Sequence, residues 1–221
     1  MIRMHLTHCR LALVLGLTLA VAVMSSALAG SGVTLGHVSG LAYSADGEQL
    51  IVAGDDALAV YADGRWTKMP GPPNGCTSFS GTHAALYCNG HAASSAQHRE
   101  VSGLMTSRNG GRSWQNLGPA GDSDLHTLAT SYGGDGIYVF NDEPNRRMGR
   151  AGIYYSLNAG LQWQRADATG LTSRINSLAV HPSDPRTIAA GANTGLYLSR
   201  DSGDNFEQLV AGGPVLGEDF D

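Results

Sequence analysis

Side chains able to bind or hydrolyse a ligand are concentrated in two segments, residues 89–100 and 141–150. Each segment carries a glutamate, Glu100 or Glu143, and two carboxylates that flank a glycosidic bond can hydrolyse it as acid and as nucleophile or base. Arginine and histidine side chains in the same segments suit a carboxylate, a phosphate or a sugar hydroxyl. The further candidates for ligand binding are His37, His91, His98, Arg99, His126, Asp142, Arg146, Arg147, Arg150 and Arg174.

In a second interpretation, these residues are solvated loop charges and locally hydrogen-bonded histidines. A metal site is not expected, because His91 and His98 are seven residues apart, with Ala, Ser and Gln between them, and lack the dense ligand spacing of a zinc site. The chain has neither a Gly-x-Ser-x-Gly nucleophile elbow nor a phosphate-binding loop, and we expect no cofactor. Its formal net charge of -5 argues against nucleic acid as a partner.

The elements that must position these segments repeat along the chain. The pattern Ser-x-Asp/Asn-x-Gly-x-x-aromatic occurs at 107–114, 156–163 and 199–206, with a degenerate copy at 61–66 around Asp63. In such a turn the Ser and Asp/Asn side chains bond nearby backbone, the glycine takes a positive φ, and the aromatic ring is buried. We therefore expect structural rather than catalytic roles for Ser107, Asn109, Gly111, Trp114, Ser156, Asn158, Gly160, Trp163, Ser199, Asp201, Gly203 and Phe206.

Four short strands are predicted in each repeat. In the last repeat they are 175–180, 187–190, 195–199 and 206–210. Glycine is abundant, at 30 of 221 residues, and charged residues are only 15%, which favours short strands joined by tight turns. A period of about 40–50 residues made of four strands is typical of a β-propeller blade. We predict an all-β propeller of about four antiparallel blades over residues 30–221, with units at about 36–70, 75–118, 123–167 and 172–211.

The repeated pattern resembles the Asp box, or BNR repeat, of sialidases, sortilin-like receptors and photosystem II assembly-factor-like propellers. The resemblance covers Gly36 to about Val210. It implies that each box is the turn between the third and fourth strands at the blade periphery, and that a ring contains six to ten blades. Four units are fewer than that, which leaves three alternatives: a truncated member, an open four-blade array, or a half-ring completed by a second subunit in a homo-oligomer.

Strand parity places the two ligand-binding segments on one face. Turns after the first and third strands of an antiparallel blade lie on one side, with the boxes, so turns after the second strand and the links between blades lie on the other. Segments 89–100 and 141–150 follow second strands, while His37, His126 and Arg174 enter first strands. We therefore predict a polar pocket for a protein or glycan on the face opposite the boxes, because long loops on a rigid scaffold are common binding sites.

Fewer sequence features indicate an enzyme than a binding protein. The resemblance to sialidases implies an arginine triad, a Tyr–Glu nucleophile pair, an acid/base Asp and an early Phe/Tyr-Arg-Ile-Pro motif, but Arg174-Ile175 is not followed by proline. None of the glutamates falls on an evident inner strand. We expect an exported, non-catalytic binding or assembly scaffold. The alternative is a sialidase-like glycoside hydrolase that uses Glu143 and Glu100.

Residues 1–29 have the plan of a cleaved Sec signal peptide. Arg3 and Arg10 precede an apolar run at 11–24, and Ala27-Leu28-Ala29 supplies the small residues before a cleavage site. The alternative is an uncleaved anchor, but the run is short of the ~20 residues that span a bilayer. We expect a periplasmic or extracellular protein with no stable membrane insertion after cleavage.

Export changes the interpretation of the cysteines. Once Cys9 is removed with the leader, Cys76 and Cys88 remain and flank a predicted hairpin with a turn at 81–83. An even pair in an oxidising compartment favours a disulfide. The alternative is two unpaired buried thiols.

Overall fold

Apolar residues that recur between short turns produce strands throughout the chain. The computed structural model describes residues 32–73, 75–90, 103–117, 125–144 and 148–220. Within these ranges the secondary-structure elements are all β-strands, and the sixteen strands form four sheets. The described part contains no helix that could cross a bilayer.

Each sheet is built from four strands that are consecutive in the sequence and pair antiparallel. Sheet 1 comprises β1 (Val38–Tyr43), β2 (Leu50–Gly54), β3 (Ala57–Ala62) and β4 (Arg65–Pro70). Sheet 2 comprises β5 (Ser78–Gly81), β6 (Leu86–Asn89), β7 (Leu104–Ser107) and β8 (Gln115–Asn116). Sheet 3 comprises β9 (Leu125–Thr130), β10 (Ile137–Asn141), β11 (Gly152–Ser156) and β12 (Gln164–Arg165). Sheet 4 comprises β13 (Ile175–Val180), β14 (Ile188–Ala192), β15 (Gly195–Ser199) and β16 (Glu207–Ala211).

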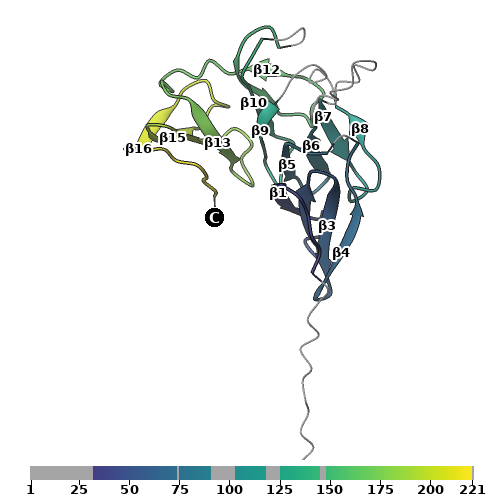
Figure 1. Ribbon diagram of the computed structural model, residues 1–221. Helices are drawn as coiled ribbons and strands as arrows, with labels where there is room; N and C mark the ends of the chain where they lie inside the picture. Colours follow the sequence, from purple (N-terminus) through teal and green to yellow (C-terminus); the bar gives the residue numbers. More distant parts are fainter. Residues whose placement is uncertain (1–31, 74, 91–102, 118–124, 145–147, 221) are drawn as a thin grey trace, which may run out of the picture.

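The four sheets follow one another along an arc, with the first strand of each sheet on its inner side (Figure 1). β1 contacts β5, β5 contacts β9, and β9 contacts β13, whereas no comparable contact joins β13 to β1 among the described strands. Four-stranded antiparallel sheets arranged around their first strands are the blades of a β-propeller. The predicted all-β fold with four such blades is confirmed.

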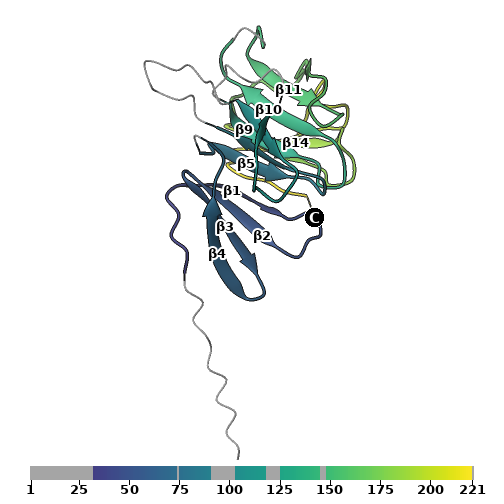
Figure 2. The same ribbon diagram turned by 90° about the vertical axis from the view of Figure 1, so that its right-hand side faces the viewer.

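Apolar clusters fill the three spaces between successive sheets. Ile51 and Leu58 of sheet 1 pack against Phe79 and Met105 of sheet 2. Between sheets 2 and 3 the cluster is built around Leu104 and Ile137, and between sheets 3 and 4 around Tyr138, Ile188 and Tyr197. Because apolar burial is the main favourable term in folding, these three interfaces hold the arc together. Sheet 1 ends the row, with one face turned away from the other sheets (Figure 2).

The segment 212–220 covers part of the outer face of sheet 4. The Val215 N–H donates to the Ala192 carbonyl at 3.0 Å, and the Asn176 side chain donates to the Val215 carbonyl at 3.1 Å. Further along, Ser177 hydrogen-bonds Glu218, and Phe220 packs against the cluster of Ala179, Ala189 and Leu198.

A disulfide joins Cys76 to Cys88, with their Cα atoms 5.6 Å apart. Cys88 lies in β6 opposite Phe79, and Cys76 comes two residues before β5 begins. Both cysteines are buried between sheets 1 and 2. The predicted pairing is confirmed.

Candidate functional site

The turn at 107–114 owes its shape to side-chain hydrogen bonds. The Ser107 hydroxyl accepts from the Gly111 N–H at 2.9 Å and donates to Asn109 Oδ1 at 3.0 Å. Asn109 Oδ1 also accepts from the Ser113 N–H at 2.9 Å. The Trp114 indole folds back and donates to the Gly111 carbonyl at 3.0 Å. One buried hydroxyl and one amide therefore fix the whole turn.

The same network recurs in the turns at 156–163 and 199–206. The hydroxyl of Ser156 accepts from Gly160 at 2.8 Å, and that of Ser199 accepts from Gly203 at 2.9 Å. The three glycines have φ of 86°, 86° and 91°, a region that favours glycine. In the last turn, hydrogen bonds from the Asn205 side chain, the Asn205 N–H and the Ser199 hydroxyl lower the pKa of Asp201. The Asp201 carboxylate therefore stabilises the turn.

The degenerate copy at 61–66 is built differently from the other three turns. Asp63 and Gly64 alone connect β3 to β4, with φ of 49° and 74°, which is a two-residue hairpin with both residues left-handed. Trp66 is not in the position of Trp114 between sheets. It pairs across the strands with Tyr61, ring centroids 5.0 Å apart, on the face of sheet 1 that no other sheet covers.

Replacing Ser156 with alanine tests the role of the repeated turn. The change removes the acceptor of the buried Gly160 N–H, so we expect a loss of about 1–2 kcal/mol in the free energy of unfolding. Urea denaturation followed by tryptophan fluorescence measures it. Ser113→Ala removes an exposed hydroxyl whose hydrogen bond, accepted from the Asn109 side chain at 2.8 Å, is exposed to solvent, and should change stability by less than about 0.5 kcal/mol. Equal effects of the two variants would contradict the assignment.

The two sides of the arc are distinguished by which turns lie together. The turn at 199–206 meets the β13–β14 connection, where the Ser202 N–H donates to the Arg186 carbonyl at 2.9 Å. In sheet 3 the Ala159 N–H likewise donates to the Asp135 carbonyl. On the opposite side, His37 N–H donates to Asp55 Oδ2 at 3.1 Å, next to the β2–β3 turn. Asn193, in the β14–β15 turn, donates to the Arg174 carbonyl. His37 and Arg174 therefore share the face opposite the repeated turns.

The longer second-to-third connections open on this same face. One begins where the Gly90 N–H approaches the Gly103 carbonyl at 3.5 Å. In the other, the Arg150 carbonyl accepts from the side chains of Asn141 at 3.2 Å and Tyr154 at 2.9 Å, and Met148 is buried beneath it. These bonds anchor the base of the second connection to sheet 3 and leave the Arg150 residue itself exposed.

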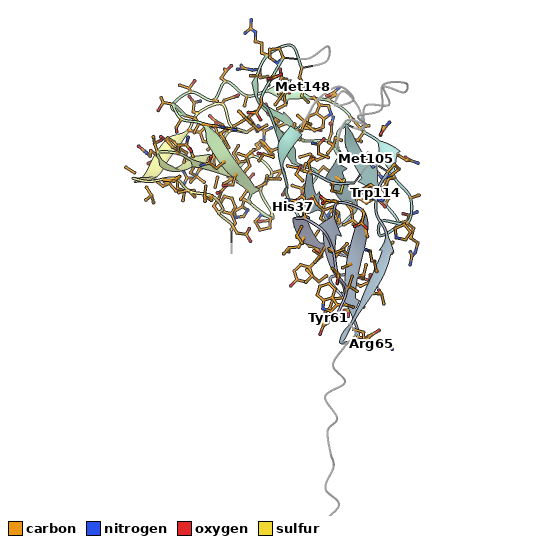
Figure 3. The ribbon with its side chains drawn as sticks, viewed as in Figure 1. His37, Tyr61, Arg65, Met105, Trp114 and Met148 are labelled. Carbon is orange, nitrogen blue, oxygen red and sulfur yellow. A yellow bond between two sulfur atoms is a disulfide. The ribbon has the colours of Figure 1, made fainter. Side chains whose placement is uncertain are left out.

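The candidate side chains do not converge in the described structure. His37, Asp142, Glu143, Arg150 and Arg174 are all exposed, and among described residues no hydrogen bond or ion pair joins any two of their side chains. Figure 3 shows His37 well apart from Met148, which lies two residues before Arg150. His91, His98, Arg99, Glu100, Arg146 and Arg147 lie outside the described residues, as does the side chain of His126.

Other chemistry is not assembled there either. No group of three metal-ligating side chains occurs among the described residues. A cavity of about 50 Å³ lies on the other side, between the β1–β2, β5–β6 and β7–β8 turns, with Ile51, Leu86 and Arg108 among its walls.

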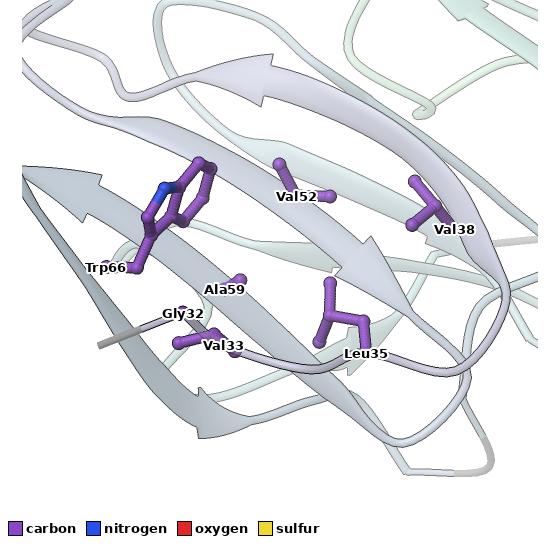
Figure 4. A pocket seen from close by; sticks show the side chains of 7 residues that line it. All are labelled: Gly32, Val33, Leu35, Val38, Val52, Ala59 and Trp66. Carbon is purple, nitrogen blue, oxygen red and sulfur yellow. The ribbon is translucent and has the colours of Figure 1, made fainter. Parts of the chain in front are cut away.

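Two features were missed by sequence reasoning. A hollow of about 300 Å³ lies on the uncovered face of sheet 1, between Val33, Leu35, Val52 and Trp66 (Figure 4). Its signal was present, because strands β1 to β3 carry apolar residues at alternate positions on both faces. The second feature is Glu218, in the segment that follows β16. It is half-buried on sheet 4, where burial raises its pKa.

No family model and no curated protein matches the chain. Among solved structures it is similar to an ancestral GH74 enzyme, at 18% identity and a TM-score of 0.53 over 80% of this chain and 24% of that one. A gluconolactonase from Xanthomonas campestris gives 14% identity and a TM-score of 0.56, over 80% of this chain and 63% of that one.

The extracellular domain of a hybrid two-component system from B. thetaiotaomicron gives 16% identity and a TM-score of 0.54, over 82% of this chain and 22% of that one. The chain thus spans less than two thirds of each of these proteins. All three are β-propeller proteins. The protein belongs to the structural class of β-propellers, and at these identities the likeness is one of fold alone.

Proposed function

We propose that this protein is an exported, non-catalytic β-propeller that binds a protein or glycan on the face opposite the repeated turns. The observation that carries the proposal is the unequal length of the connections on that face. Only Asp55 and Asp56 join β2 to β3, and only Asn193 and Thr194 join β14 to β15. In sheets 2 and 3 the equivalent connections are 90–103 and 142–151. Long loops on neighbouring blades of a rigid scaffold are a common place for binding.

The arginines of this face, which stand among carboxylates such as Asp55, Asp142 and Glu143, support an anionic group on the ligand. The chain has a formal net charge of -5, yet Arg150 and Arg174 are exposed on this one face, and Arg99, Arg146 and Arg147 belong to the same connections by sequence. A guanidinium binds a carboxylate, sulfate or phosphate through two parallel hydrogen bonds. A glycan with acid groups or an acidic protein segment therefore suits the face best.

The disulfide supports export. Cys76 and Cys88 are paired, and disulfides persist in the periplasm or outside the cell but are rare in reducing compartments. A cleaved leader at 1–29 would deliver the chain there, although that segment lies outside the described residues.

The carboxylates support binding over hydrolysis. Glycoside hydrolysis requires two carboxyl groups held about 5–10 Å apart, one of them with a raised pKa. Among the described carboxylates of this face, Asp142 and Glu143 are exposed in one connection, and Asp55 and Asp56 are exposed in the short turn of sheet 1. Exposed loop carboxylates of this kind fit contacts to a ligand better than proton transfer.

Removing two arginines tests the proposal. The double variant Arg150→Ala/Arg174→Ala should reduce binding to acidic glycans on an array, or capture of a partner from cell-envelope extract, by at least about tenfold, because two charge-assisted contacts are lost. Arg65→Ala/Arg200→Ala, at exposed positions at the start of β4 and just after β15, is the matched control and should bind normally.

Binding that survives in the first variant, or that falls equally in the control, would place the ligand elsewhere. The same purified protein should be tested on fluorogenic glycosides, including a sialoside. Turnover that is lost on Glu143→Gln would replace the scaffold by the sialidase-like hydrolase.

A further inference from the structure

One face of sheet 1 is apolar and has no sheet against it. Alternate residues of β1, β2 and β3, such as Ile51 and Leu58, point toward sheet 2, and the residues between them point the other way. In register across the strands, this outer face of sheet 1 consists of Leu41, Tyr43, Leu50, Val52, Ala59, Tyr61 and Trp66. Leu41 is 62% exposed, Tyr43 55% and Tyr61 41%. Single exposed apolar residues are ordinary, but a contiguous set marks an interaction surface.

The outer face of sheet 1 also contains a hollow. Its walls are the segment 32–35, Val38, Val52, Ala59 and Trp66, and it encloses about 300 Å³ (Figure 4). All the side chains that line it are apolar. Leu41, which neighbours Val52 across the strands, projects beside it. A projecting apolar side chain next to an apolar hollow is the form in which one residue anchors an interface by filling a pocket.

The molecule itself shows what covers faces of this kind. Sheets 2, 3 and 4 each bury one face against the sheet that precedes them, through Phe79 and Leu86, Ile137 and Val139, and Ile188 and Tyr197 respectively. In all three cases the covering element is another four-stranded antiparallel sheet. The outer face of sheet 1 has the same alternating apolar pattern, so an apolar sheet face is the partner that fits it.

The other end of the arc does not offer such a face. The outer face of sheet 4 already carries segment 212–220, with Val215 bonded to Ala192 and Phe220 packed on Ala179 and Leu198. This segment occupies the part of the face beside β13 and β14. Among the described sheets, the uncovered apolar face is therefore that of sheet 1.

Charge does not oppose self-association through this face. Lys68 is the charged side chain at its edge, in register with Ala59, and it is paired with Asp56 at 3.4 Å and reaches the Thr34 carbonyl. When two copies of the face meet, the Lys68 charge at each edge is already paired with Asp56, and the centre of the interface consists of aromatic and aliphatic side chains. Aromatic residues at the centre of a patch are typical of interfaces.

We propose that a second copy of this chain docks on the outer face of sheet 1, with the same face of the partner opposite it. The pairing is isologous, the arrangement most homodimers adopt. The exposed apolar side chains offer on the order of 500 Å² per copy, or about 1,000 Å² for the pair, which is below the roughly 1,200–2,000 Å² of standard stable interfaces and typical of weak, transient ones. The dimer is therefore expected to form with a dissociation constant on the order of micromolar. The proposed binding face, opposite the repeated turns, stays free in both copies.

Sedimentation velocity and light scattering of the mature protein, from low to high micromolar concentration, test the proposal. The wild type should pass from monomer to dimer. Leu41→Asp should remain monomeric, with association weakened at least tenfold, because the dimer would bury an unpaired carboxylate. Since Leu41 is 62% exposed in the monomer, circular dichroism of this variant should be unchanged.

Two control variants distinguish the pairing from its alternatives. Leu161→Asp alters a leucine that is 82% exposed on a repeated turn, and should dimerise like the wild type. Val210→Asp, 55% exposed on sheet 4 beside Leu196, should do the same. Loss of association in Val210→Asp would show that sheet 1 pairs with sheet 4 and would overturn the proposal.

A wild type that is monomeric at every concentration would also overturn the proposal, as would a Leu41→Asp variant that associates normally. If Leu41→Asp changes the circular dichroism spectrum, Tyr43→Ser takes its place. That variant removes an exposed ring of the same face without adding charge, and the same two outcomes decide.

Discussion

Tyr138→Ala should lower the free energy of unfolding by about 3–5 kcal/mol, the cost of deleting a large buried ring. Tyr138 lies in β10, is fully buried, and stacks on Tyr155 with ring centroids 5.6 Å apart. Its hydroxyl donates to the Pro185 carbonyl at 2.7 Å, in the connection between β13 and β14. The ring thus joins sheet 3 to sheet 4 both by packing and by a hydrogen bond.

Tyr138→Phe separates these two contributions. The ring remains, but the Pro185 carbonyl loses its donor, so the expected loss is only about 1–2 kcal/mol. Leu161→Ala, at an exposed position, should have no effect beyond about 0.5 kcal/mol. Urea denaturation with an unchanged dependence on denaturant gives the three values. A loss below 1 kcal/mol for Tyr138→Ala would show that the two sheets are held together by other contacts.

Removing the disulfide should cost about 3 kcal/mol. Cys76 and Cys88 close a short loop, with a sequence separation of 12, and loss of such a cross-link increases the entropy of the unfolded chain. The double variant Cys76→Ala/Cys88→Ala should therefore unfold at a lower urea concentration than the wild type. Because the two side chains also pack between sheets 1 and 2, the loss should not be smaller than this.

The control for this prediction is reduction of the wild type. Dithiothreitol should destabilise the wild type by a similar amount and should leave the double variant unchanged. Two freely alkylatable thiols in the folded, exported protein would contradict the pairing.

Sheet 4 shows how much of the fold could be predicted. The sequence predicted strands at 175–180, 187–190, 195–199 and 206–210, and the structure has Ile175–Val180, Ile188–Ala192, Gly195–Ser199 and Glu207–Ala211. Alternating apolar residues bounded by Gly, Asn and Asp turns define such strands locally, so no knowledge of neighbours is needed. The same reasoning located the disulfide, because hairpin geometry brings Cys76 and Cys88 together.

Trp66 shows where the sequence misleads. In the degenerate copy at 61–66 it is the aromatic residue of the pattern, but the two-residue turn at Asp63-Gly64 pairs it with Tyr61 and places its ring on the outer face of sheet 1. A strand with apolar residues on both faces does not state which face a neighbour covers. The hollow on sheet 1 could therefore be recognised only once the sheets were placed.

For the face opposite the repeated turns, the sequence predicted a location and not a set of contacts. Strand parity correctly put His37 and Arg174 on the side opposite the repeated turns, because alternation of turns along an antiparallel sheet is a matter of counting. Which side chains meet is decided by long, exposed residues in irregular connections, such as Asp142 and Arg150, and no sequence pattern fixes their directions.

The contacts between first strands carry a consequence for how disturbances spread. β5 touches β1 and β9, β13 touches β9, and the ends of the row meet no comparable partner among the described strands. In a linear array of this kind, cooperativity passes only from neighbour to neighbour, and the units at the two ends each have one boundary fewer to lose. Local opening should therefore begin at the ends and stop at the next boundary. A destabilising substitution in sheet 4 should unfold that end of the array locally, while the fold around Cys76 and Cys88 persists.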